Sequence, residues 1–337
     1  MRKSVIRQSN IELLRCVLMF MVVVSHFVDH NILEKNTPVE LGGDNFIVSH
    51  LLNSLCICAV NCFVLISGYF TIKLSLRRIL LFLIPIAFYQ FLLSVVFYPF
   101  NHSISISPFR YWFVSPYVGL MLLSPLLNKG LEQLSWKGLR NIICVLLLLF
   151  VLPVISVSGQ NGRNLFMFIL MYLTGYYIRH YYSKNSQWWR YCLLYMLFAT
   201  LVFTEAFVLI KMGFNQGYAT MSYYYDNILI FFEAVFLFLL FTKFDFRSNI
   251  INWVASSSFF VYIISENENM YTGSHSLYAM MGVGSWNHLA IYPFLILGSA
   301  LLVFICSILV DKVRVTIFSN LEDRIGEWAD KLKISFE

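Results

Sequence analysis

The chain has 337 residues, of which 59% are hydrophobic and 12% are charged. Soluble globular domains average about 25% charged residues, so this composition excludes an ordinary soluble domain and predicts a protein with many membrane-spanning helices. The formal net charge of +6 does not indicate nucleic-acid binding, because the basic residues form short clusters between apolar segments rather than one patch.

Ten apolar segments predict ten transmembrane helices. They lie at approximately 11–28, 46–70, 78–99, 111–128, 140–157, 164–180, 190–211, 226–242, 250–270 and 288–310. With the N-terminus in the cytoplasm, all but four of the 24 lysines and arginines fall on the cytoplasmic side, the exceptions being Lys35, Arg110, Arg163 and Lys211. Such an excess is typical of membrane topology. We therefore expect an all-α polytopic membrane protein with about ten transmembrane helices and both termini cytoplasmic.

Two parts of the chain are expected to differ in their relation to the membrane. Residues 1–311 are predicted to form the transmembrane domain, whose first helix is retained because no small-residue cleavage site follows it. Residues 312–337 are predicted to form a cytoplasmic amphipathic tail helix, because apolar and acidic residues alternate there at helical spacing. The seven cysteines all lie in apolar segments, which favours packing residues over disulfides or a metal site.

The first apolar segment carries polar residues at helical spacing. Arg15 and His26 are eleven residues apart, so they share one helix face and lie about 16 Å apart along the axis. Glu12 can pair with Arg15, and Asp29 can contact His26, because each pair is three residues apart. Asp29 would then hold the imidazole in the tautomer that a general base needs. The alternative for His26 is a structural hydrogen bond to a neighbouring helix.

Other polar residues leave two interpretations open. Glu205 and Glu233 lie within predicted spans, where a carboxylate is either functional or the partner of a side chain on another helix. The adjacent Arg77 and Arg78 can clamp a phosphate-bearing cofactor, but the cytoplasmic bias of basic residues explains them equally. Tyrosines and amides in the loop 212–225 can bind a sugar or form an interfacial aromatic belt.

Several motifs occur in an order that resembles the membrane-bound acyltransferase 3 family. They are Arg15 and His26 at R-x10-H, Phe63-Val-Leu-Ile-Ser-Gly-Tyr-Phe, Arg77-Arg78, the stretch 111–128 beginning Tyr-Trp-Phe-Val-Ser-Pro-Tyr, and Ser258-Phe-Phe-Val-Tyr-Ile-Ile. The resemblance covers roughly residues 11–310. A transporter or flippase for a lipid-linked sugar or small metabolite is the alternative, since it would use the same buried charges as a translocation path.

The resemblance implies transfer of an acyl group, usually acetyl, from cytoplasmic acyl-coenzyme A (acetyl-CoA) to a carbohydrate hydroxyl. The acceptor would be a bacterial surface polysaccharide or its lipid-linked precursor, and the protein would lie in the bacterial plasma (inner) membrane. It further implies His26 as the essential histidine and Arg15 as the motif arginine, with Asp29 as its neighbour. Arg77 and Arg78, with Ser67 and Tyr69 nearby, are the expected coenzyme A site, and no metal is expected.

The chain departs from the family pattern in two places. Many members have a histidine where this chain has Ser265, directly before Glu266 and Asn267. The role of that second histidine is then absent or supplied from elsewhere, for which His275 and His288 are the candidates. Some members also carry a C-terminal extracytoplasmic esterase-like domain, which we do not expect here.

Overall fold

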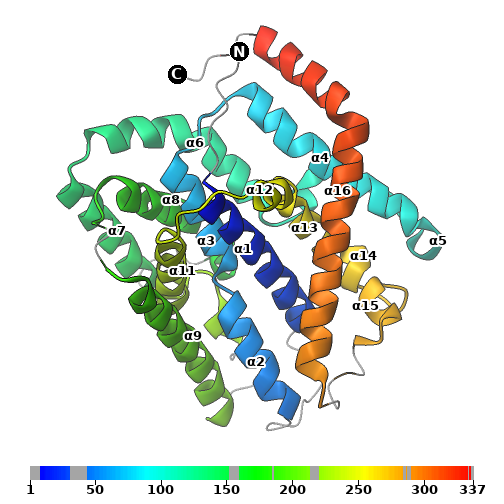
Figure 1. Ribbon diagram of the computed structural model, residues 1–337, viewed down its shortest axis with the longest axis horizontal. Coiled ribbons are helices and arrows are strands. Elements are labelled where there is room, and N and C mark those ends of the chain that lie inside the picture. Colours follow the sequence, from blue (N-terminus) through cyan, green and yellow to red (C-terminus); the bar gives the residue numbers. More distant parts are fainter. Residues whose placement is uncertain are drawn as a thin grey trace.

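The computed structural model describes residues 8–30, 44–151, 159–183, 186–212, 220–283, 286, 290–332 and 334, and these ranges contain helices and no strands (Figure 1). The first half forms α1 (Ser9–Val28), α2 (Asp44–Cys56), α3 (Ala59–Phe70), α4 (Leu76–Val96), α5 (Tyr98–Asn101), α6 (Val114–Gln133) and α7 (Trp136–Val151). The second half forms α8 (Leu165–His180), α9 (Trp188–Lys211), α11 (Ile228–Phe241), α12 (Asn249–Ala255), α13 (Ser258–Ser265), α14 (Glu268–Tyr271), α15 (Leu277–Met280) and α16 (Tyr292–Lys331).

Every predicted apolar segment overlaps at least one of these helices. By length and composition, six stretches can cross a membrane: Ser9–Val28, Ile47–Phe70, Leu76–Val96, Trp188–Lys211, Met221–Phe241 and Tyr292–Lys331. The segment predicted at 250–270 is divided among α12, α13 and α14. The all-α polytopic membrane architecture is therefore confirmed, whereas the count of ten spans stays a prediction.

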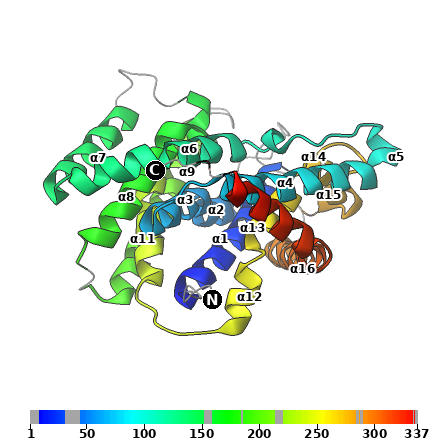
Figure 2. The same cartoon turned by 90° about the horizontal axis from the view of Figure 1, so that it is seen from above.

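Helix α1 lies in the middle of the bundle. It packs against α2, α3, α11, α12, α13 and α16. Seen from above, α7, α8 and α9 lie on one side of α1, and α4 and α16 lie on the other (Figure 2). Leu14, Leu18, Val23 and Phe27 are fully buried, so α1 faces protein rather than lipid along most of its length. Polar side chains on α1 therefore meet neighbouring helices or cavities.

Helices α3 and α8 cross at two glycines that allow their backbones to touch. A Cβ atom on Gly68 of α3 would lie 2.0 Å from the carbonyl oxygen of Tyr172 in α8. A Cβ atom on Gly175 of α8 would lie 2.2 Å from the carbonyl oxygen of Leu65 in α3. Only glycine fits at such an approach, as in many membrane helix pairs.

Helix α16 runs without a break through the boundary predicted at 311–312. The Tyr89 hydroxyl of α4 donates a hydrogen bond to the buried Asp311 carboxylate at 2.9 Å, and Arg314 donates to the same oxygen at 2.8 Å. Arg314 also pairs with Glu322. The last apolar segment and the tail therefore form one helix, and the hydrogen bond from Tyr89 holds that helix against α4.

Replacing Gly68 or Gly175 by alanine should destabilise the protein by at least about 1–3 kcal/mol, because the new methyl group overlaps backbone atoms that cannot rotate away. Thermal unfolding in detergent micelles measures this effect. Gly298→Ala in α16 is the matched control, since no atom of another element lies within 4 Å of the added Cβ. Equal unfolding temperatures for Gly68→Ala and Gly298→Ala would contradict the close crossing.

Candidate active site

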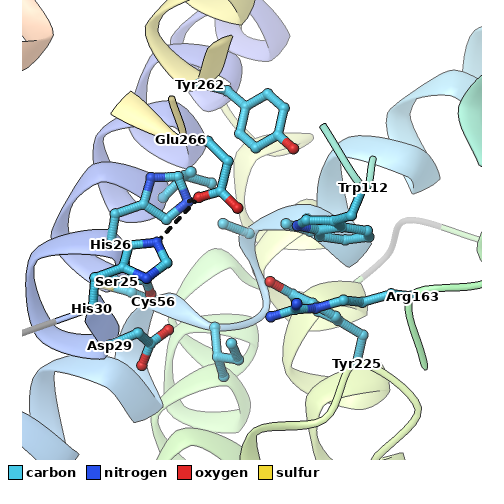
Figure 3. A pocket seen from close by; sticks show the side chains of 14 residues that line it. Ser25, His26, Asp29, His30, Cys56, Trp112, Arg163, Tyr225, Tyr262 and Glu266 are labelled. Atoms are coloured by element: carbon cyan, nitrogen blue, oxygen red, sulfur yellow. Dashed lines mark hydrogen bonds and ion pairs between the residues drawn. The ribbon is translucent and has the colours of Figure 1, made fainter. Parts of the chain in front are cut away.

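His26, near the C-terminal end of α1, is bonded through both ring nitrogens to the end of α13. Its Nδ1 lies 3.1 Å from the Ser265 hydroxyl, and its Nε2 lies 2.9 Å from Oε2 of Glu266. Ser265 is the last residue of α13 and Glu266 follows it, so both groups project from the helix end toward α1. A half-buried imidazole and a half-buried carboxylate thus meet across two helices (Figure 3).

His30 binds the same carboxylate. Its Nε2 lies 3.3 Å from Glu266 Oε2, and its ring stacks on Tyr271 at a centroid distance of 3.7 Å. The sequence reasoning missed His30, although it follows His26 by four residues and hence lies on the same face of a helix. His30 therefore supplies a second imidazole beside His26. Of the two candidates for that role, His275 stacks on Phe100 instead, and His288 lies outside the described residues.

The structure corrects the role expected for Asp29. The carboxylate bonded to His26 is that of Glu266, whereas Asp29 Oδ1 accepts a hydrogen bond from Asn53 at 2.9 Å. The Ser25 hydroxyl donates to the same Asn53 side chain at 3.0 Å. Asp29 still lines the cavity beside His26. Spacing along α1 could not reveal this, because the partner of the imidazole comes from the end of α13.

A small cavity of about 30 Å³ separates two walls of different chemistry. His26, His30, Asp29 and Glu266 form one wall. Trp112, Arg163 and Tyr225 form the other, with Tyr262 above the space between them (Figure 3). A space of this size holds a group about as large as a water molecule. The walls thus bring a base, a carboxylate and a guanidinium around one small volume.

The guanidinium wall is held by a tight loop. Gly162, at φ 73°, packs so closely that a Cβ atom there would lie 2.4 Å from the Asp226 backbone nitrogen. The Tyr225 backbone N–H donates to the Asn161 carbonyl at 3.1 Å. Arg163 directly follows this loop, so its position is set by the contact with residues 225 and 226.

Ring stacking orients the same wall. The Trp112 and Tyr225 rings stack with centroids 5.1 Å apart, and the Arg163 guanidinium carbon lies 5.3 Å from the centroid of Trp112. On α3, the Asn61 amide donates to the Tyr225 carbonyl at 2.9 Å. Tyr225 belongs to the loop expected to bind a sugar or form an aromatic belt, of which residues 213–219 lie outside the described part.

Polar groups also gather near the N-terminal end of α1. Arg15 pairs with Glu12 at 3.1 Å, as the spacing predicts. Ser67 lies 3.2 Å from the Tyr117 hydroxyl, and both Arg15 and Arg78 act electrostatically on that hydroxyl. Two residues expected at the coenzyme A site, Ser67 and Arg78, and the motif arginine Arg15 therefore lie close to one tyrosine.

Tyr69 does not join this group. Its buried ring packs against Phe238 at a centroid distance of 5.0 Å, with the Arg179 guanidinium 4.9 Å from its centre. The groove at the start of α4, of about 550 Å³, is lined instead by Ser75, Arg77, Arg78, Leu81 and Phe82. The expectation that Tyr69 lies beside the arginine pair is thus wrong, because its side chain points from α3 toward α11.

The structure separates the two adjacent arginines. Arg77 forms ion pairs with Asp330 at 2.9 Å and Asp323 at 3.6 Å, and its guanidinium packs directly on Gly326 of α16. Arg78 donates to the Lys73 carbonyl at 2.5 Å. Arg77 is therefore paired with the acidic end of α16. Arg78 is the arginine of the pair whose charge lies near the Tyr117 hydroxyl.

The remaining polar candidates lie away from the cavity. Glu205 accepts a hydrogen bond from Asn227 at 2.8 Å on the exposed surface of α9. Glu233 is fully buried on α11 beside the Cys58 thiol. Cys56 lines the cavity, but no group of three or more metal-binding side chains occurs in the described part of the chain.

The protein is therefore an all-α polytopic membrane protein. Its central helix carries a histidine that pairs with a carboxylate beside a cavity, as in many enzyme active sites. A family model described as an acyltransferase domain matches residues 8–312 of the chain. The chain belongs to this family, the acyltransferase 3 family that its motifs resemble, and it is a membrane acyltransferase. Comparisons with curated proteins and with solved structures produced no match.

Arg77→Ala should loosen the last turns of α16, because it removes both ion pairs and the surface on which Gly326 rests. Gly326→Ala should do the same, since its Cβ would lie 2.6 Å from the Arg77 guanidinium carbon. Amide hydrogen exchange across residues 323–331 should become faster in both variants. Arg78→Ala is the matched control. Unchanged exchange in Arg77→Ala would show that these ion pairs do not hold the helix end.

Proposed function

We propose that this protein transfers an acetyl or other acyl group from acyl-coenzyme A to a hydroxyl of a cell-surface polysaccharide or its lipid-linked precursor. The observation that carries the proposal is the contact of His26 with Glu266 at 2.9 Å beside a cavity. An imidazole supported by a carboxylate is the usual general base for activating a hydroxyl group. The bacterial inner membrane is the location proposed with this activity.

The hydrogen bonds favour one tautomer of His26. The ionised Glu266 carboxylate only accepts hydrogen bonds, so Nε2 of His26, 2.9 Å from its Oε2, carries the proton and donates it, and Nδ1 accepts a hydrogen bond from the Ser265 hydroxyl. This assignment follows from the network. Nδ1 is then the nitrogen that takes up a proton, and Glu266 stabilises the imidazolium that results.

The reaction proceeds by a balanced transfer. The acceptor hydroxyl gives its proton to Nδ1 of His26, and its oxygen forms a bond to the acyl carbonyl carbon. The carbon–sulfur bond then breaks, and the thiolate of coenzyme A takes the proton back from the imidazolium. Holding the acceptor hydroxyl in this small cavity against His26 would supply proximity and exclude water.

The two ends of α1 would bind different substrates, the acyl donor at the Arg15 end and the acceptor at the His26 end. The phosphates of coenzyme A would bind Arg78 in the groove at the start of α4, with Arg15 on the neighbouring end of α1, and this groove opens to the cytoplasm if the N-terminus is cytoplasmic. The pantetheine arm would have to span the distance from Arg15 to His26, about 16 Å along the axis of α1. The sugar would enter from the opposite end, where Trp112 and Tyr225 offer aromatic rings.

His26→Ala should lower acyl transfer about 10²–10⁴-fold, because the general base is lost. Membranes carrying the wild type or the variant are given radiolabelled acetyl-CoA, and label in the glycan fraction is counted. His275→Ala, whose ring stacks on Phe100 away from the cavity, is the matched control. Full transfer by His26→Ala would refute the catalytic role. Absence of transfer by the wild type, with loss of glycan export on deletion, would favour a transporter.

Arg78→Ala should weaken coenzyme A binding about tenfold or more, because a charge-assisted phosphate contact is lost. Arg77→Ala should have a smaller effect, since Arg77 is already paired with Asp330 and Asp323. Isothermal titration of the detergent-solubilised protein with coenzyme A compares the two variants directly. Equal affinities in the wild type and Arg78→Ala would exclude this groove as the donor site.

A further inference from the structure

The Tyr262 hydroxyl is a buried polar group that the mechanism above leaves unused. The residue is 4% exposed, and its hydroxyl has no hydrogen-bond partner in the described part of the chain. The Phe113 backbone N–H lies close to the hydroxyl oxygen, but an N–H only donates, so it does not take the hydroxyl proton. Burying an unpaired hydroxyl opposes folding, so a site that retains one needs a compensating reason.

Tyr262 lies where a reacting group would meet it. Its ring centroid is 6.1 Å from that of His26, and both residues line the same cavity. On α13 it precedes Glu266 by four residues, so the helix presents the hydroxyl and the carboxylate on one side. In Figure 3 the hydroxyl points away from the His26–Glu266 pair and toward the wall that carries Trp112 and Arg163.

Arg163 adds a fixed positive charge at the same place. Its guanidinium faces the cavity from the wall opposite His26 (Figure 3). Stacking on Trp112 holds its plane, and the tight turn at Gly162 holds its backbone. The guanidinium and the phenol are therefore hydrogen-bond donors that the fold positions before any substrate arrives.

We propose that the Tyr262 hydroxyl and the Arg163 guanidinium stabilise the negative charge that develops on the carbonyl oxygen of the acyl group. When the acceptor oxygen bonds to the carbonyl carbon, the carbon–oxygen π electrons move onto that oxygen. The two donors bind it there, and the electrons return as the carbon–sulfur bond breaks. Donors placed in advance in a dry site stabilise such a transition state more than the ground state. This inference rests on the proposed acyl transfer.

Tyr262→Phe tests the inference because it removes one oxygen atom and keeps the ring. We expect kcat to fall about 10²–10³-fold with KM changed less than about threefold, as for loss of one oxyanion donor. The unfolding temperature should stay the same or rise, since an unpaired buried hydroxyl is removed. Normal kcat, or a loss confined to KM, would overturn the inference. So would a lower unfolding temperature that parallels the loss of activity.

The chain offers a matched control in Tyr278. Its hydroxyl is also buried without a hydrogen-bond partner in the described residues, but its ring stacks on Phe27 and it does not line the cavity. Tyr278→Phe should therefore leave kcat unchanged. Equal losses in Tyr262→Phe and Tyr278→Phe would show that removing a buried hydroxyl, rather than an oxyanion donor, causes the effect.

Arg163→Ala probes the second donor. Its kcat should fall, and added guanidinium ion should restore part of the activity, whereas urea at the same concentration should not. A purely structural role of Arg163 in packing on Trp112 would give no such selectivity. Equal rescue by both solutes, or by neither, would remove Arg163 from the proposed pair of donors.

A binding measurement separates failure of this inference from failure of the proposed function. Infrared difference spectra of acetyl-CoA labelled with ¹³C at the carbonyl should show a lower carbonyl frequency in the wild type than in Tyr262→Phe. Transfer by the wild type with identical bands in both proteins would overturn only the donor roles. No transfer by the wild type would refute the proposed function, and the band shift would then decide separately whether Tyr262 binds a carbonyl oxygen.

Discussion

The contact between His26 and Glu266 is the interaction on which the arrangement of the site depends. An imidazole and a carboxylate in an apolar bundle are each costly to bury alone, so they are stable there only with partners. The pairing requires the end of α13 to lie against α1, and it brings Ser265 to the second ring nitrogen. The same carboxylate also holds His30, which makes one side chain the centre of the polar wall.

Close backbone approach elsewhere makes this geometry possible. The glycines at the α3–α8 crossing bring α3 near the centre of the bundle, where its Asn61 amide fixes the Tyr225 carbonyl. The turn at Gly162 then sets Arg163 beside Trp112. Both walls of the cavity are thus positioned by backbone contacts and hydrogen bonds, which are stiffer than the packing of long side chains.

The end of α1 away from the cavity is organised by charge rather than by packing. Glu12 holds Arg15, and the acidic last turns of α16 hold Arg77. Two arginines that both line the groove therefore have different partners, since Arg77 is bound to α16 and Arg78 to the Lys73 carbonyl. Because successive residues of a helix point in directions about 100° apart, such a division is expected once a charged helix packs on one of them.

Local periodicity alone determined the helices, the Glu12–Arg15 pair and the placement of Arg15 and His26 along one helix, because these follow from spacing within a single segment. The partner of His26, the exclusion of Tyr69 from the groove and the wall of Trp112, Arg163 and Tyr225 were decided only by tertiary structure. Each of these depends on which distant segment packs against a given side chain, and hydrophobic patterning within one segment does not encode that packing. His30 belongs partly to each group. Its spacing from His26 is visible in the sequence, but its contact with Glu266, more than 200 residues away, depends on the tertiary structure.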